Sequence, residues 1–497
     1  MKAWVVLAVT LALSPAVARA ANKWFVVESK NFRIYSDGPQ EEVKQLAAKL
    51  ERFRHVVVKL YKLNPTDEPI SVVAFQEPRM FAGFRPYLGD AVVLGYNLGL
   101  GIEDMVALAM YDHGPGEQEV LYHECFHALV EAGHNGWPLW LNEGAAEVFS
   151  TFEERGDKVL IGSGKWMHIR ELRKHGFMSL DHLLTAQVNT YNELCVFYPH
   201  SWALTHYLML ADHHAHLDQM AEFVHLLRRG TNDGSAFRQT FEIAPAALEK
   251  SLAQYIRDER FPALEIPAAE LGDESISDAQ AISDAQRDCI FGNLVLSKQD
   301  VSRAEYYFKE ALARDPGLAN PYEGLGLCAA LRKRYTEAQH WFEQGFARDT
   351  RHYRAHLYYG LALYLEHAGN RWYAESVPRE KAVAIVEELK KCIALRPRFP
   401  ASYAVLAQLA LNPGEDPAEG MKLIQHALQF QPQNKYFMLT EAKLQIRLRD
   451  YETARHTLQP LLGKDVRDDL LKKEVRAAQK ELDSLSQASL GSTVNKP

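Results

Sequence analysis

The second half of the chain carries a repeat, and this repeat restricts the folds that are open to it. Small and aromatic residues recur 34 positions apart between about residue 281 and residue 465. The matched sets are Ala304 and Ala338, Phe308 and Phe342, Ala311 and Gly345, Asp315 and Asp349, Gly420 and Ala454, and the series Gly292, Gly326 and Gly360. Such a pattern predicts stacked pairs of helices, because small residues let two helices approach while aromatic rings fill the groove between them.

The repeat has the length of a tetratricopeptide unit, so residues 281–465 are expected to form an all-α solenoid. About five units fit, with degenerate units at the ends and an insertion near residues 366–380. The concave face of such a solenoid suits an extended peptide or a helix, which indicates a protein partner on the repeat surface. The tail, residues 466–497, is charged and then rich in serine, and we expect it to fray.

The first residues have the pattern of an export signal. Lys2 precedes an apolar run from Ala3 to Leu13, and small residues occupy both ends of Ala18-Arg19-Ala20. The pattern predicts a signal peptide over residues 1–20, with cleavage before Ala21. No cysteine follows as a site for a lipid anchor, and no later stretch approaches the roughly 20 apolar residues of a membrane helix. We therefore expect a soluble protein of the bacterial periplasm or a secreted one, without a membrane span.

The composition is that of a globular protein with more than one domain. The 497 residues are too many for one hydrophobic core, and 47% hydrophobic with 24% charged residues is an ordinary balance. The net charge is −8 and no cluster of lysine and arginine stands out, so nucleic acid is not an expected partner. The five cysteines are odd in number and irregularly spaced, which excludes a complete disulfide framework.

The first half, residues 22–262, is predicted to be mixed α/β at its start and helical towards its end. Apolar and polar residues alternate where strands are expected and recur at helical spacing where helices are expected. Residues 263–280 are acidic and contain a proline, which predicts a linker before the repeats. The predicted elements are a strand pair over residues 24–37, a helix over Glu41–Leu63, strands over Ile70–Phe75 and Asp90–Tyr96, and helices from Glu117 to about Arg260.

Two histidines around a glutamate are the strongest chemical signal in the first half. His123 and His127 lie four residues apart on a predicted helix that stops at Gly133, so both rings project from one face and can bind one cation. Glu124 lies at the flank, where it can take a proton from an activated water instead of binding the metal. On its own this motif is a modest signal, and the plainer interpretation is a solvated helix with two histidines.

A second predicted helix, which begins near Pro138, supplies two more carboxylates. Glu143 can complete a set of three protein ligands and leave one position open, as catalytic zinc sites do. Glu147 lies one turn further on the same face, where it can accept the other ring N–H of a histidine ligand and fix its tautomer. The plainer interpretation of Glu147 is a surface carboxylate. Gly144 and the two alanines after it leave room for the two helices to pack closely.

The sequence HECFH followed by WLNEGAAE resembles the gluzincin class of zinc metallopeptidases, and most closely the bacterial peptidase MA-like branch, whose members often carry tetratricopeptide repeats. The resemblance implies an α+β thermolysin-like domain, one Zn²⁺ per chain and hydrolysis of peptide bonds in a protein or peptide substrate. It assigns His123, His127 and Glu143 as zinc ligands, Glu124 as the general base and Glu147 as the carboxylate behind a ligand. Endoproteolysis is preferred, because no acidic motif for a free amine lies near the site.

Such a peptidase also needs a hydrogen-bond donor for the oxyanion of its intermediate. The segment CVFYPHSWALTHY, residues 195–207, resembles the Tyr-x-x-Ser-Trp helix of this branch and indicates Tyr198, with His200 as the alternative. A tyrosine at such a place is more often a half-buried packing residue. By analogy with the class, the predicted strand Ala91–Tyr96 is an edge strand that pairs with an extended substrate.

A second function from a different class is open. The repeats could make the protein a binding scaffold, in which the metal site is vestigial or purely structural. The presence of all five positions of the motif, including the non-ligand Glu124, favours an active peptidase.

Overall fold

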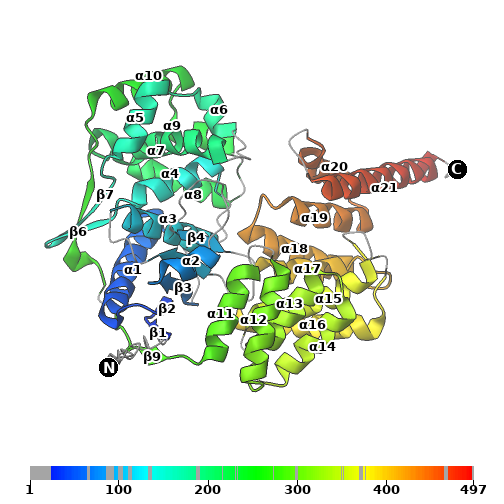
Figure 1. The fold of residues 1–497 in the computed structure, drawn as a ribbon. Helices are drawn as coiled ribbons and strands as arrows, with labels where there is room; N and C mark the ends of the chain where they lie inside the picture. The colour runs from blue at the N-terminus through cyan, green and yellow to red at the C-terminus, as the bar shows by residue number, and fades with distance from the viewer. Residues whose placement is uncertain are drawn as a thin grey trace, which may run out of the picture.

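The chain folds into an α/β half and a helical solenoid, which lie side by side in Figure 1. The computed structural model describes residues 24–63, 68–84, 95–98, 105–109, 115–132, 137–185, 191–214, 216–229, 231, 233–272, 274–296, 300–348, 350, 352–368, 373–374, 376–463 and 468–494. The predicted signal peptide lies outside these residues, as do residues 90–94 of a predicted strand and the turn at residues 133–136.

Within the described residues, six strands form a mixed sheet at the centre of the first half. In spatial order they are β4 (Gly95–Leu98), β5 (Met105–Ala109), β3 (Ile70–Phe75), β2 (Phe32–Ser36), β1 (Phe25–Glu28) and β9 (Gln280–Ala281). β2, β3 and β5 are parallel, whereas the β1–β2, β1–β9 and β4–β5 pairs are antiparallel. β3 is buried at every residue, as expected of a central strand that is covered on both faces.

The two faces of the sheet are covered by different parts of the chain. On one face, alternate residues of β1, β2 and β3 join the core formed with α1 (Gln40–Tyr61) and α3 (Pro115–Ala132). On the other face, the rings of Trp24 and Phe75 pack against Phe291 of the first solenoid helix, with centroid distances of 5.3 and 6.2 Å. The first half and the solenoid therefore share one hydrophobic core.

Residues 263–280 differ from the linker that the sequence predicts. β8 (Leu264–Pro267) pairs with β7 (Lys158–Ile161) in a second, smaller sheet, and β9 closes the edge of the main sheet. The acidic residues of the segment pair with lysines of the first half, two of them on α1. Lys59 Nζ, for example, lies 2.6 Å from Glu270 Oε2. The segment is fixed to the α/β half instead of separating two bodies.

Helices dominate the rest of the first half. The central helix is α7 (Tyr191–His214), because its residues Trp202, Leu204 and Leu208 are fully buried. It is contacted by α4 (Leu139–Phe149), α5 (Trp166–His175), α8 (Leu217–Arg228) and α10 (Pro245–Asp258). The other elements are α2 (Pro78–Phe84), β6 (Glu153–Arg155), α6 (Leu180–Thr185), α9 (Asp233–Phe241) and the 3₁₀ turn Ala268–Glu270.

The second half is an all-α solenoid of tetratricopeptide type. Consecutive helices pack in pairs. The pairs are α11 (Asp284–Leu296) with α12 (Val301–Arg314), α13 (Asn320–Leu331) with α14 (Tyr335–Phe346), α15 (Tyr353–Ala368) with α16 (Arg379–Leu395), α17 (Pro400–Leu409) with α18 (Pro417–Phe430), and α19 (Lys435–Arg447) with α20 (Tyr451–Leu458). A Cβ at Gly292 would lie 2.6 Å from the Phe308 ring, and one at Gly326 would lie 2.9 Å from the Phe342 ring. This contact explains the 34-residue period.

The insertion of the third pair ties distant repeats together. It separates α15 from α16, and Tyr373 within it is buried against the last repeat. Its hydroxyl shares a hydrogen bond of 3.0 Å with Thr440 Oγ1 of α19, and Lys443 Nζ lies 4.6 Å from the centroid of its ring.

The tail was expected to fray, but most of it is helical. Residues 459–462 form a 3₁₀ turn, and Asp469–Val494 form the long helix α21, at the upper right of Figure 1. The apolar side chains that anchor α21 on the last helix pair are Leu471, Val475, Ala478 and Leu482. Their spacing is that of one helical face, which the surrounding charged residues conceal in the composition.

A buried histidine joins α7 to the neighbouring elements. His206 Nε2 donates a hydrogen bond of 2.6 Å to the carbonyl of Gly162, and the Tyr255 hydroxyl donates one of 2.9 Å to His206 Nδ1. Burial lowers the pKa of His206 to about 4, although the Gly162 carbonyl favours the charged ring. The folded protein therefore holds this imidazole neutral at neutral pH.

This environment predicts an acid-sensitive stability. The unfolded chain binds a proton at His206 near its ordinary pKa, whereas the folded chain does not, so the contribution is complete at neutral pH and is lost as the pH falls towards 4. We expect the wild type to lose about 2 kcal/mol more than His206→Gln between about pH 8 and pH 5. Urea unfolding of both metal-free proteins at each pH measures this difference, and parallel pH profiles would contradict it.

Candidate metal centre

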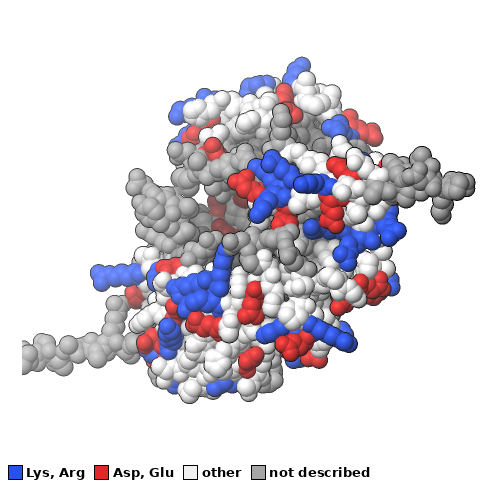
Figure 2. All heavy atoms as spheres, turned by 90° about the vertical axis from the view of Figure 1, so that its right-hand side faces the viewer, with Lys and Arg blue, Asp and Glu red and all other residues white. Residues whose placement is uncertain are grey.

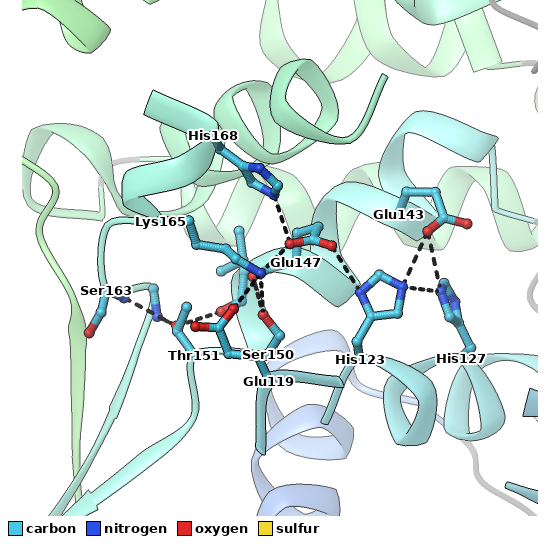
Figure 3. A network of polar contacts seen from close by, with 12 residues as sticks. Glu119, His123, His127, Glu143, Glu147, Ser150, Thr151, Ser163, Lys165 and His168 are labelled. Atoms are coloured by element: carbon cyan, nitrogen blue, oxygen red, sulfur yellow. Dashed lines mark hydrogen bonds and ion pairs between the residues drawn. The ribbon is translucent and has the colours of Figure 1, made fainter. Parts of the chain in front are cut away.

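Helices α3 and α4 hold the motif residues face to face (Figure 3). On α3, Tyr122, Cys125 and Phe126 are buried in the core, which directs the opposite side of the helix, with His123 and His127, towards α4. α4 begins directly after Pro138, whose φ of −62° suits the entry to a helix. The second helix thus starts where the sequence predicts.

Three ligand-type atoms converge between these helices. The Nε2 atoms of His123 and His127 are 3.0 Å apart, and each lies 3.4 Å from Glu143 Oε2. Bonds of about 2.0 to 2.1 Å to a tetrahedral Zn²⁺ place its ligands about 3.3 Å from one another. The three atoms therefore have the mutual spacing that a zinc ion requires, and they form the cluster of metal-binding type found among the described residues.

The hydrogen bonding of the three residues also fits a cation. His123 Nδ1 lies 3.2 Å from Glu147 Oε1, so its proton is directed there and its Nε2 lone pair faces the other two atoms. Glu143 Oε2 is buried and has no hydrogen-bond partner among the described residues. Burial opposes charge on His123, but Glu143 and Glu147 outweigh it and raise its pKa to about 10. The site thus attracts positive charge strongly, and the residues present fit Zn²⁺.

Glu147 lies behind His123, and it is buried. Oε1 faces His123, while Oε2 accepts a hydrogen bond of 2.8 Å from His168 Nε2 and an ion pair from Lys165 Nζ. Burial alone would raise the pKa of Glu147, but Lys165, His123 and His168 together lower it well below its ordinary value. The interpretation of Glu147 as a surface carboxylate is therefore wrong.

Lys165 and His168 are additions to the site that the sequence did not indicate. Lys165 precedes α5, and its ammonium also contacts Glu119 Oε2 at 2.9 Å and Ser150 Oγ at 3.0 Å. Burial opposes the charge, but Glu147 and Glu119 keep the pKa of Lys165 above its ordinary value. No sequence pattern links residues 165 and 168 to the motif. The one local signal is Glu119, which lies one helical turn before His123 on the same helix.

The structure separates the two candidates for the oxyanion donor. Tyr198 is half-buried, and its ring centroid lies 6.0 Å from that of His123. His200 is buried and turns its ring nitrogens to two backbone carbonyls instead, Val196 at 2.7 Å and Gly176 at 3.2 Å. Burial lowers its pKa. His200 therefore fastens α7 to the end of α5, and Tyr198 is the one that the fold brings to a ligand histidine.

Glu124 and β4 occupy positions consistent with their predicted roles. Glu124 is half-buried and makes no hydrogen bond or ion pair with the described residues, so its carboxylate is not committed to a structural contact there. β4 lies at the edge of the main sheet and contacts α3. It overlaps the predicted strand at Gly95 and Tyr96.

Gly144 lies against α7, a contact that the sequence did not indicate. A Cβ at this position would lie 2.3 Å from the carbonyl oxygen of Ser201 and 2.3 Å from Thr205 Oγ1, both on α7. α4 therefore touches the backbone of α7 at the residue next to Glu143, and this contact sets the position of the carboxylate helix.

The comparisons with known proteins bear on the repeats. No protein-family model matches the chain, and no curated protein matches it either. Solved structures that are similar include YrrB, a TPR protein with an unusual peptide-binding site (18% identity, 40% of this chain and 92% of that chain, TM-score 0.32), a thermophilic TPR protein of Thermus thermophilus (17%, 39% and 98%, 0.31), and the APC/C hetero-tetramer Cut9–Hcn1 (13%, 78% and 75%, 0.32). None of these three is described as a peptidase.

Figure 2 shows Lys and Arg mixed with Asp and Glu over one face of the molecule, without a continuous basic stripe on that face. In the parts of the chain that the structure describes, every helix is too short or too polar to cross a bilayer.

The contact at Gly144 predicts a structural and a metal-binding defect together. Gly144→Ala would force α4 away from α7, so we expect a loss of about 2 to 3 kcal/mol in the free energy of unfolding and weaker zinc binding, because Glu143 and Glu147 move with the helix. Denaturant unfolding of the metal-free protein and zinc titration measure the two effects. Gly83→Ala is the matched control, since nothing lies within 4 Å of its Cβ. Equal behaviour of the two variants would refute the packing role.

Proposed function

We propose that the protein is a zinc-dependent peptidase of the gluzincin type, with an α+β thermolysin-like catalytic domain and repeats that bind a protein substrate or partner. The observation that carries the proposal is the spacing of His123 Nε2, His127 Nε2 and Glu143 Oε2, which fits one tetrahedral cation, with Glu124 next to His123 on the same helix. The pattern of residues 1–20 supports the further proposal that the enzyme is exported.

The residues of the chain have separate tasks in this proposal. His123, His127 and Glu143 would hold the ion, which when bound supplies Lewis acidity that polarises a carbonyl and makes a water more acidic. Glu124, on the flank of the ligand helix, would accept a proton from the attacking water and pass it to the leaving amine. Glu147 would keep the His123 ring in the tautomer that presents Nε2.

Tyr198 would be the oxyanion donor. Its ring lies beside His123 on the central helix α7, and its hydroxyl is the type of donor that stabilises a developing negative charge on a carbonyl oxygen. Its rival His200 has both ring nitrogens directed to backbone carbonyls, which supports the choice of Tyr198.

A second function is favoured by the comparisons. Two of the three similar solved structures are described as TPR proteins, and one of these two by its peptide-binding site. They fit a protein-binding scaffold better than they fit a peptidase. In that case the metal cluster would hold α3 against α4, and Glu124 would have no chemical task.

The test compares wild type with Glu124→Gln after expression from Ala21. We expect about one zinc per chain in both by elemental analysis, and cleavage of unfolded casein by the wild type alone, with a loss of roughly 100-fold or more in the variant. His123→Gln should lose zinc and activity together.

Glu171→Gln serves as the matched control and should cleave like the wild type, because the Glu171 side chain is 40% exposed and its ion pairs are with Arg170 and His175 of its own helix α5. Stoichiometric zinc without cleavage of unfolded proteins by the wild type would support the scaffold instead. An absence of zinc at stoichiometric loading would remove the metal centre from both functions.

A further inference from the structure

Lys165 places a fixed positive charge next to the metal centre. Glu119 and His123 lie one turn apart on α3, and Glu143 and Glu147 lie one turn apart on α4. Lys165 Nζ contacts Glu119 and Glu147, whereas His123, His127 and Glu143 converge one turn further along. The same helix pair is thus bridged twice, once by an ammonium group of the chain and once by residues that fit a metal ion.

The side chain of Lys165 is held in place from several directions. It is only 12% exposed, and Ser150 Oγ lies 3.0 Å from its ammonium in addition to the two carboxylates. The loop before it is fixed because Thr151 Oγ1 accepts hydrogen bonds from the backbone N–H of Gly162 and Ser163, at 2.7 and 3.1 Å. An ammonium group anchored in this way has little freedom to move, so its position sets the position of the Glu147 carboxylate.

The anchored ammonium of Lys165 fixes the orientation of the Glu147 carboxylate. Oε2 is occupied by Lys165 and His168, which leaves Oε1 pointing at His123 Nδ1. The orientation of a ligand histidine depends on the partner of its second ring nitrogen. Since Glu147 stands between the ammonium and the ligand atoms and neutralises the ammonium, the charge of Lys165 repels a bound cation little.

Building on the metal centre of the proposed function, we propose that Lys165 is a positioning residue, which clamps Glu147 so that His123 presents Nε2 to the zinc ion. Lys165 itself touches neither the metal ligands nor the reacting atoms. It acts through Glu147, and Glu119 supplies the second anchor on α3.

A double-mutant cycle on zinc affinity tests this role. The Kd is measured by competition with a chromophoric chelator at neutral pH for wild type, Lys165→Met, Glu147→Gln and the double variant. We expect each single substitution to weaken binding roughly 10- to 100-fold. The double variant should bind about as weakly as Glu147→Gln alone, because the lysine has no route to the metal without that carboxylate.

Two further variants separate positioning from folding. Lys158→Met removes an exposed ion pair with Glu265 (2.7 Å) on the neighbouring strand and should leave the Kd unchanged. Glu119→Gln keeps Lys165 and is partly exposed, so it should fold normally and weaken binding only a few-fold. The visible spectrum of the Co²⁺-loaded proteins reports whether the ligand geometry changes in Lys165→Met.

The outcomes distinguish this role from the proposed function. Tight zinc binding by both wild type and Lys165→Met would overturn the positioning role and leave the metal centre intact. A loss of affinity that persists in full in the Glu147→Gln background would also overturn it, because Lys165 would then act by another route. A wild type that binds no zinc would overturn the positioning role together with the metal centre.

Discussion

Carboxylates between two packed helices must be compensated by positive charge, and this constraint organises the first half of the protein. Glu119, Glu143 and Glu147 lie on α3 and α4, and burial makes an unpaired charge costly at Glu143 and Glu147. Lys165 and His168 compensate the charge of Glu147, and Lys165 also pairs with Glu119, whereas Glu143 faces the two histidines, with which it could share a cation. The orientations of His123 and Glu147 follow from this balance, because each faces a group of opposite charge or a hydrogen-bond partner.

The position of α4 links that balance to the rest of the fold. α4 is pressed against the backbone of α7 at Gly144, and α7 in turn is packed by α5, α8 and α10. α7 also carries Tyr198, so the helix that fixes the position of α4 is the same helix that brings the Tyr198 ring beside His123. Glu143 and Tyr198 are thus both positioned by α7, as the proposed site would require.

Sequence reasoning succeeded where the signal was local and failed where partners met only in the fold. His123 with His127 and Glu143 with Glu147 are visible because helical spacing brings each pair to one face of its helix. The 34-residue period is visible because a glycine meets a phenylalanine ring in successive units, Gly292 with Phe308 and Gly326 with Phe342. The role of Lys165 was not predicted because its partners lie on α3 and α4, and no sequence period connects residue 165 to these helices. The acidic segment at residues 263–280 looked like a linker because Lys44 and Lys59, which neutralise Asp278 and Glu270, lie more than 200 residues earlier. β5 was missed because a five-residue apolar run such as MVALA cannot be assigned by periodicity.

The shared core between the sheet and the first solenoid helix has a consequence for the order in which the protein can be made. Strands β1 to β5 and both helices of the candidate metal centre are synthesised well before β9 and α11, so Trp24 and Phe75 leave the ribosome without the layer that will cover them. Chains generally fold from the N-terminus as domains emerge, but here the last strand of the sheet and the Phe291 ring that covers it are made late. A chain cut short before the repeats would keep His123, His127 and Glu143 and lose the layer that covers one face of the sheet.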